Sequence, residues 1–108
     1  IGKHKAMKMI LTGDMISADE ADQMGLVSEV VEDEMTIKRA IEMAEQLAGY
    51  SPIALEQIKE VANLGVDMPL PAALALERKA FQILFDTEDQ KEGARAFLEK
   101  RQANYKGQ

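Results

Sequence analysis

Hydrophobic residues recur along this chain at helical spacing, in blocks separated by glycine, proline and hydroxyl residues. Over residues 36–48 an apolar side chain returns every three or four positions for three turns, which is typical of an amphipathic helix. The same period predicts five further helices, over residues 3–11, 18–24, 52–64, 88–101 and from Pro69 or Pro71 to 85. The pattern therefore predicts a mainly α-helical chain.

Hydroxyl residues mark several expected helix starts. Ser17 lies three residues before a glutamate, the spacing of a capping box in which hydroxyl and carboxylate each accept from a backbone amide. Thr87 repeats that spacing with a glutamine, and Ser51 precedes Pro52, which suits the first helical position. Gly25 is expected in the left-handed conformation that ends the second helix.

The predicted helices carry apolar faces of unequal width. The face of the last helix is thin, so this helix needs a partner to be ordered. The expected faces are, for the helix over residues 52–64, Ala54, Leu55, Ile58, Val61 and Ala62; for the helix that ends at residue 85, Leu70, Ala73, Leu74, Phe81 and Leu84; and for the helix over residues 88–101, Ala94, Phe97 and Leu98.

One short segment departs from the helical pattern. Residues 26–31 end in β-branched residues and predict at most one short strand. A lone strand has no ladder partner within the chain. The chain also runs from Ile1 straight into a helical pattern. We therefore expect a piece of a longer protein.

Composition and charge narrow the possible functions. The length of 108 residues suits one small domain, and no apolar run is long enough to span a membrane. The net charge of −6 opposes nucleic-acid binding, and residues 21–31, which could be taken for a helix-turn-helix, carry acids without bases. Cysteine is absent, which excludes disulfides and thiolate metal sites.

The sequence contains no group of residues that is typical of a catalytic site. His4 is the single histidine and is flanked by lysines, so we interpret it as a solvated surface residue. Carboxylate pairs such as Asp19/Glu20 and Glu88/Asp89 lie in polar runs at helix starts, where capping and solvation explain them. We expect no metal site.

The last helix combines an aromatic side chain with clustered cations. Phe97 is followed one turn later by Lys100, and Arg101 comes next. One interpretation is that these cations complement the helix dipole while Phe97 docks. The other is a patch for a phosphorylated, adenine-bearing ligand. The residues alone leave both open.

Two segments at this spacing resemble the crotonase family. The first contains Leu-Thr-Gly-Asp at 11–14 and Gly-Leu-Val at 25–27; the second contains Phe-Asp-Thr-Glu-Asp-Gln at 85–90 and Ala-Phe-Leu-Glu-Lys-Arg at 96–101. The second resembles the C-terminus of enoyl-CoA hydratases and 3-hydroxybutyryl-CoA dehydratases. The resemblance implies the C-terminal helical, trimerising region of the ClpP/crotonase-like α/β spiral fold. Residues 1–50 would end the spiral core, and residues 51–108 would form the oligomerisation region.

The resemblance also implies a function. The intact protein would hydrate or dehydrate acyl-CoA thioesters as a homotrimer or hexamer, with coenzyme A as part of the substrate and no separate cofactor. Phe97 and Lys100 match positions that contact the coenzyme A nucleotide of a neighbouring subunit, and Phe81 matches a wall of the acyl pocket. The family's two catalytic glutamates and its oxyanion hole match no residue here, so we expect this chain alone to be inactive.

Two alternative functions are kept beside this one, and a cellular location is also expected. The intact protein could instead catalyse another crotonase-family reaction, such as enoyl-CoA isomerisation. The chain could also be a stand-alone helical oligomerisation module. We expect a cytoplasmic protein that binds neither nucleic acid nor membrane.

Overall fold

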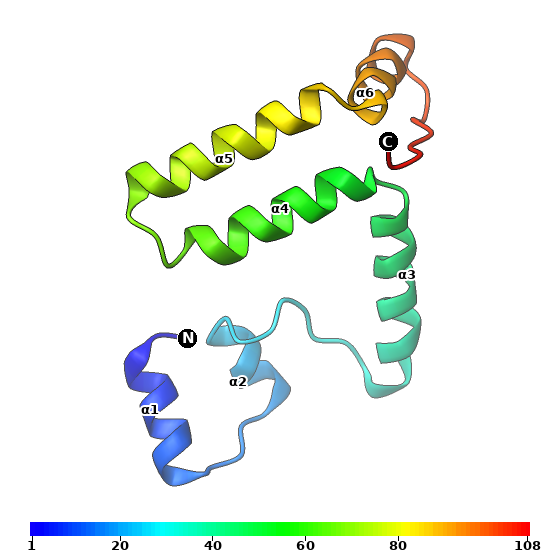
Figure 1. Ribbon diagram of the computed structural model, residues 1–108. Coiled ribbons are helices and arrows are strands. Elements are labelled where there is room, and N and C mark those ends of the chain that lie inside the picture. The colour runs from blue at the N-terminus through cyan, green and yellow to red at the C-terminus, as the bar shows by residue number, and fades with distance from the viewer. The chain divides into compact units, whose positions relative to one another are not determined.

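The computed structural model describes all 108 residues and contains helices but no strand (Figure 1). Two compact units, Ile1–Ile41 and Glu42–Gln108, are described separately. No helix has both the length and the apolar character needed to cross a membrane. The helices are α1 Lys3–Thr12, α2 Ala18–Gln23, the 3-10 helix η1 Asp33–Met35, α3 Thr36–Ala48, α4 Pro52–Gly65, α5 Leu70–Phe85 and α6 Glu88–Glu99.

The helix boundaries of the first unit follow the local signals. Ser17 Oγ accepts from the Glu20 amide at 3.2 Å, and the Glu20 carboxylate accepts from the Ser17 amide at 2.8 Å, so the predicted capping box is confirmed. Gly25 has φ 73° and ends α2 in the expected left-handed conformation. Gly13 ends α1 in the same way, with φ 68°.

The strand expected near residues 26–31 is absent. These residues form bends and irregular chain that lead into η1. The reason is the one visible in the sequence: a strand is stabilised by a ladder of hydrogen bonds to a second strand, and this chain contains none.

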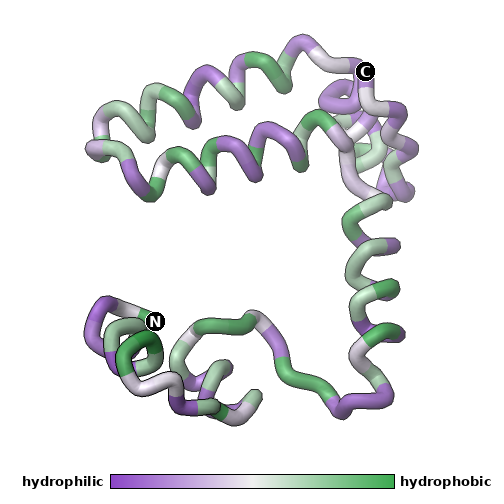
Figure 2. Tube along the Cα trace, turned by 60° about the horizontal axis from the view of Figure 1, so that its bottom comes forward, coloured by the Kyte–Doolittle hydropathy of each residue, from purple (hydrophilic) through white to green (hydrophobic).

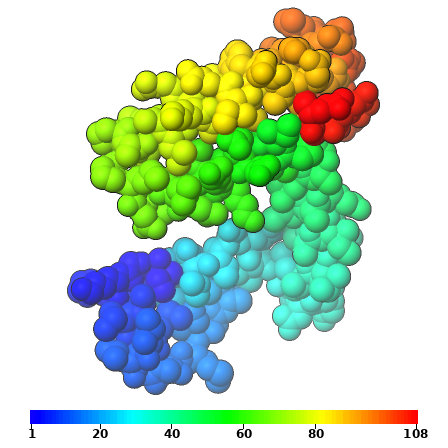
Figure 3. Space-filling model, in the orientation of Figure 1, coloured from blue at the N-terminus to red at the C-terminus, as the bar shows by residue number.

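The second unit is built around a helical hairpin. Ser51 caps α4 by accepting from the Ala54 amide, with Pro52 at the first helical position as predicted. Helix α5 returns antiparallel along α4, and α6 begins where α5 ends (Figure 1). The tail after α6 lies against the start of α4 (Figure 3), where the position of a Cβ on Gly107 is 3.4 Å from the Pro52 ring.

The packed faces of this unit coincide only in part with the expected ones. Hydrophobic and hydrophilic positions alternate along α4 and α5 (Figure 2), but the larger apolar side chains of the predicted stripes are mostly exposed. Leu70, Phe81 and Ile58 are 69%, 60% and 62% exposed. The residues of α5 that are buried or half-buried recur at helical spacing and are Ala73, Leu76, Ala80 and Leu84. Ala73 and Leu84 belong to the predicted stripe, whereas Leu76 and Ala80 do not, so periodicity identified the apolar positions and only part of the covered face.

One expectation for the last helix is wrong. Helix α6 ends at Glu99, so Lys100 and Arg101 follow it and are not part of its last turn. Its apolar face has no partner within the unit: Phe97 and Leu98 are 82% and 79% exposed, whereas Ala96 is 2% exposed. A small residue is therefore buried inside the unit, and the large ones face away from it.

Candidate functional site: helix α6 and the C-terminal tail

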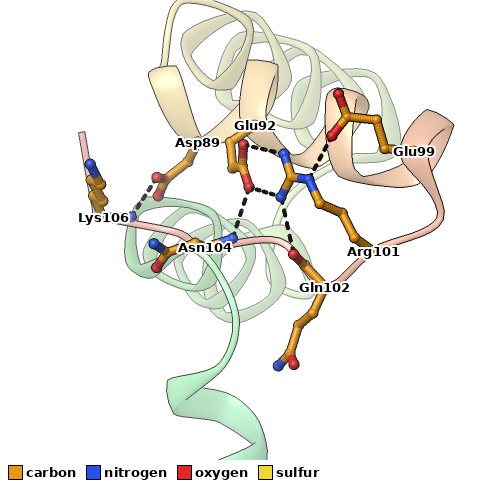
Figure 4. Close-up of polar contacts among 7 residues, drawn as sticks. All are labelled: Asp89, Glu92, Glu99, Arg101, Gln102, Asn104 and Lys106. Carbon is orange, nitrogen blue, oxygen red and sulfur yellow. Dashed lines mark hydrogen bonds and ion pairs between the residues drawn. The ribbon is translucent and has the colours of Figure 1, made fainter.

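Asp89, in the first turn of α6, is the centre of a buried polar cluster. It is 3% exposed. Its carboxylate accepts from the Ser51 hydroxyl at 2.7 Å and from the backbone amides of Lys106 at 2.7 Å and Gly107 at 2.9 Å. Its own amide donates to the Gln108 carbonyl at 3.1 Å. This one residue connects the start of α4 and the tail to α6. Figure 4 shows its contact with Lys106 of the tail.

These donors set the charge state of Asp89. Burial by itself raises the pKa of the carboxyl group, but the hydrogen bonds from Lys106, Ser51 and Gly107 outweigh it and lower the pKa below its ordinary value. Asp89 is therefore an ionised carboxylate near neutral pH. The interpretation of Glu88/Asp89 as a solvated pair at a helix start is wrong for Asp89.

Glu92, one turn further along α6, holds the other end of the tail. Its two oxygens accept from the Arg101 guanidinium at 2.6 and 3.0 Å, a bidentate geometry, and one also accepts from the Asn104 amide at 3.0 Å. The hydrogen bonds from Arg101 and then from Asn104 lower the pKa of Glu92 to about 2. Glu99 accepts from Arg101 Nε at 2.6 Å, so the guanidinium bridges two carboxylates (Figure 4).

A glycine allows the tail to approach the helix between these two anchors. A Cβ added to Gly93 would lie 3.0 Å from the Tyr105 hydroxyl and 3.4 Å from the ring. Tyr105 and Gly93 line a largely apolar groove of about 610 Å³ between the tail, α4 and the start of α6. The tail is therefore packed on α6 by an aromatic ring as well as by hydrogen bonds.

Lys100 has an unusual backbone conformation at the end of α6. Its φ of 54° and ψ of 41° are left-handed, and its amide donates to the Phe97 carbonyl at 3.3 Å. Arg101 then donates from its amide to the Ala96 carbonyl at 3.0 Å, which completes a Schellman motif. The Lys100 ammonium makes no hydrogen bond or ion pair.

The three residues expected to bind ligand lie on two helices. Phe97 and Lys100 lie at the end of α6, and both are exposed. Phe81 lies on α5, where its ring meets Phe85 edge to face at 5.0 Å, and it lines a groove of about 320 Å³ with residues of α4. No ring contact joins Phe81 to Phe97. No three His, Asp or Glu side chains are grouped to hold a metal ion.

A family model described as enoyl-CoA hydratase/isomerase matches residues 1–108. The chain belongs to this family. An enoyl-CoA hydratase of mitochondria from Pongo abelii is 46% identical over the whole chain, and a 2,3-dehydroadipyl-CoA hydratase from Escherichia coli K12 is 42% identical over 107 residues. The match covers 37% and 42% of those two proteins.

Solved structures of the family contain the same helical arrangement. An enoyl-CoA hydratase from Bacillus anthracis matches with a TM-score of 0.96 at 41% identity, and one from Geobacillus kaustophilus HTA426 with 0.94 at 44%. Both matches cover 100% of this chain and 42% of the other. The helices therefore form the helical region of a crotonase fold, as predicted, and the chain spans about two fifths of these relatives.

The sequence analysis missed the residues that organise this site. Asp89 was interpreted as a solvated acid and Glu92 was given no role, because their partners are not adjacent to them in the sequence. Ser51 is separated from Asp89 by 38 residues, and Arg101 from Glu92 by nine. No local pattern records such pairs. The available signal was a cationic tail that follows an acidic first turn, which indicates attraction but not which residues pair.

Proposed function

We propose that this chain forms the C-terminal helical region of an acyl-CoA hydratase and that Phe97 and Lys100 bind the coenzyme A nucleotide held by a neighbouring subunit. The observation that carries the proposal is an exposed aromatic ring in the last turn of α6, followed three residues later by an unpaired ammonium, in a chain of the enoyl-CoA hydratase/isomerase family. A flat apolar ring suits an adenine, and an ammonium suits phosphate oxygens. Both relatives named above are hydratases of acyl-CoA thioesters.

The acyl chain and the reaction are assigned to different parts of the protein. We propose Phe81 as one wall of an acyl pocket, because its ring is 60% exposed on an apolar groove between α4 and α5. The proton transfers of hydration are assigned to residues outside this chain. The 108-residue chain by itself is accordingly expected to lack hydratase activity, and measurable hydration of crotonyl-CoA by it would contradict this.

The ligand assignment is tested with two substrates in the complete protein. Crotonyl-CoA carries the nucleotide, and crotonyl-pantetheine lacks it. Lys100→Met is expected to raise KM for crotonyl-CoA about tenfold, the loss of one charge-assisted hydrogen bond, and to leave KM for crotonyl-pantetheine unchanged. Lys59→Met, which removes an exposed lysine of α4, is the matched control. Equal KM for crotonyl-CoA in both variants would overturn the assignment.

Subunit contacts are the second proposed role. Phe97 and Leu98 expose apolar surface that nothing in the unit covers, and such surfaces favour association between proteins. We propose a homotrimer or hexamer in which this face is an interface. Leu98→Glu is expected to shift the sedimentation coefficient of the complete protein toward smaller species. An unchanged assembly would contradict this role.

A further inference from the structure

Lys100 occupies a backbone conformation that is otherwise adopted only by glycines in this chain. The other residues with positive φ are Gly2, Gly13, Gly25 and Gly107. The comparison with α2 is direct, because Gly25 holds the left-handed position of a Schellman motif there, with φ 73°. Lys100 holds the same position after α6. A Cβ makes this conformation less favourable than it is for glycine, so the surrounding contacts must stabilise it.

Arg101 supplies those contacts. Its amide closes the Schellman motif on Ala96, and its guanidinium donates to both oxygens of Glu92, to Glu99 and to the Gln102 carbonyl at 3.1 Å. The side chain of Glu92 is 19% exposed, compared with 53% for Glu99. Glu92 is therefore the more sheltered of the two anchors, and its bidentate geometry restrains the guanidinium most tightly.

The same pairing determines which cation is available to a ligand. Arg101 engages both Glu92 and Glu99, so these carboxylates are satisfied by a neighbouring cation (Figure 4). The Lys100 ammonium is left without a partner in the protein. Arg101 is therefore bound within the protein, whereas the Lys100 ammonium faces solvent from a backbone turn that is held in one conformation.

We propose that the Glu92–Arg101 pair is a positioning device that locks the left-handed turn at Lys100 and aims the Lys100 ammonium at the phosphates of the coenzyme A nucleotide. The inference rests on the proposed function, because it takes Lys100 as the residue that meets the nucleotide. Glu92 and Arg101 do not touch the ligand in this arrangement. They lower the entropy that Lys100 loses when it binds.

The test is a double-mutant cycle in the complete protein. Glu92→Gln is expected to raise KM for crotonyl-CoA roughly fivefold, with kcat and the KM for crotonyl-pantetheine unchanged, because only placement of the nucleotide is affected. The same substitution added to Lys100→Met is expected to change KM no further, because there is no ammonium left to position. A Glu92→Gln effect that persists in the Lys100→Met background would overturn the inference and leave the proposed function standing.

Matched variants separate positioning from general loosening of the tail. Arg101→Lys keeps the charge but loses the guanidinium fork, so it should reproduce the KM increase, and it serves as the test if Glu92→Gln does not fold. Asp89→Asn releases the tail from its other anchor and should leave KM unchanged. A KM increase in Asp89→Asn equal to that in Glu92→Gln would overturn the inference. An unchanged KM for crotonyl-CoA in Lys100→Met would overturn the proposed function and the inference together.

Discussion

Helices α2 and α6 begin with the same local pattern and use it differently. Each follows a hydroxyl cap, Ser17 or Thr87, and each carries acids in its first turn. In α2 the glutamate turns back to the cap, and both partners are exposed. In α6 the hydroxyl still caps, accepting from the Gln90 amide at 3.1 Å, but Asp89 is buried and binds segments distant in sequence. An acidic first turn can thus serve its own helix or organise a tertiary site.

The same contrast holds at the other ends of these helices. Both end in a Schellman motif, with Gly25 in one and Lys100 in the other. Glycine adopts the left-handed position without help, whereas Lys100 is followed by an arginine bonded to Glu92 and Glu99. Helix α2 therefore depends on local chemistry at both ends, whereas α6 adds contacts beyond its own cap: Asp89 with distant segments at its start, and Arg101 with Glu92 at its end.

The largest effect is expected from Asp89→Asn. The amide keeps the shape but loses the charge that draws three donors together, and its NH₂ group cannot accept from them. We expect the melting temperature to fall by about 5–10 °C in the 108-residue chain. The amides of Lys106 and Gly107 should also lose hydrogen-exchange protection. Glu20→Gln in the capping box of α2 is the comparison, and an equal fall there would show that the two sites do not differ.

Acid should release the tail from α6. The pKa of Glu92 is lowered from 4.5 to about 2, so its contribution to stability is complete above pH 4.5 and is lost as the pH falls toward 2. The lowered pKa of Asp89 acts in the same direction. Hydrogen exchange of the Asn104 backbone amide, followed by nuclear magnetic resonance, should accelerate across this range. In Glu92→Gln the Asn104 amide should already be unprotected at neutral pH, and an unchanged acid profile in that variant would contradict the assignment.

The smallest effect compares two helix caps. Ser17→Ala removes one cap and is expected to cost about 1 kcal/mol. Ser51→Ala removes a cap and also the hydroxyl that donates to Asp89, so it is expected to cost about 2 kcal/mol. Urea unfolding of each variant checks the difference. Equal costs would mean that the bond between Ser51 and Asp89 adds nothing to stability.

The sequence predicted most of the helices but only part of the helix faces that pack within the second unit. Helix α3 begins and ends where the apolar period predicts, because that period persists for three turns and Gly49 follows. The end of α6 was placed two residues too late, since nothing local distinguishes Lys100 from a helical lysine. The left-handed turn is favoured by the bonds of Arg101, from its amide to Ala96 and from its guanidinium to Glu92 and Glu99.

The candidate site was predicted in part. Phe97 and Lys100 were selected from an aromatic–cationic pattern and from family resemblance, and both remain predictions as ligand contacts. The clustering of Asp89, Glu92 and the tail was not predicted, because it joins residues whose order in the chain says nothing about their distance in space. Phe81 was expected within a packed stripe, yet it is 60% exposed.

The sequence by itself determined where the chain is helical and how α2 begins and ends, because capping boxes, prolines and glycines act within a few residues. It also contained enough of the family pattern to indicate a crotonase-type helical region. Tertiary structure alone decided that Asp89 is buried, that Lys100 is left-handed and unpaired, and that small residues rather than large ones are covered. Each of these features depends on partners that are distant in the sequence and meet only when the chain folds. The local sequence therefore does not specify which partner a carboxylate binds or which apolar face is covered.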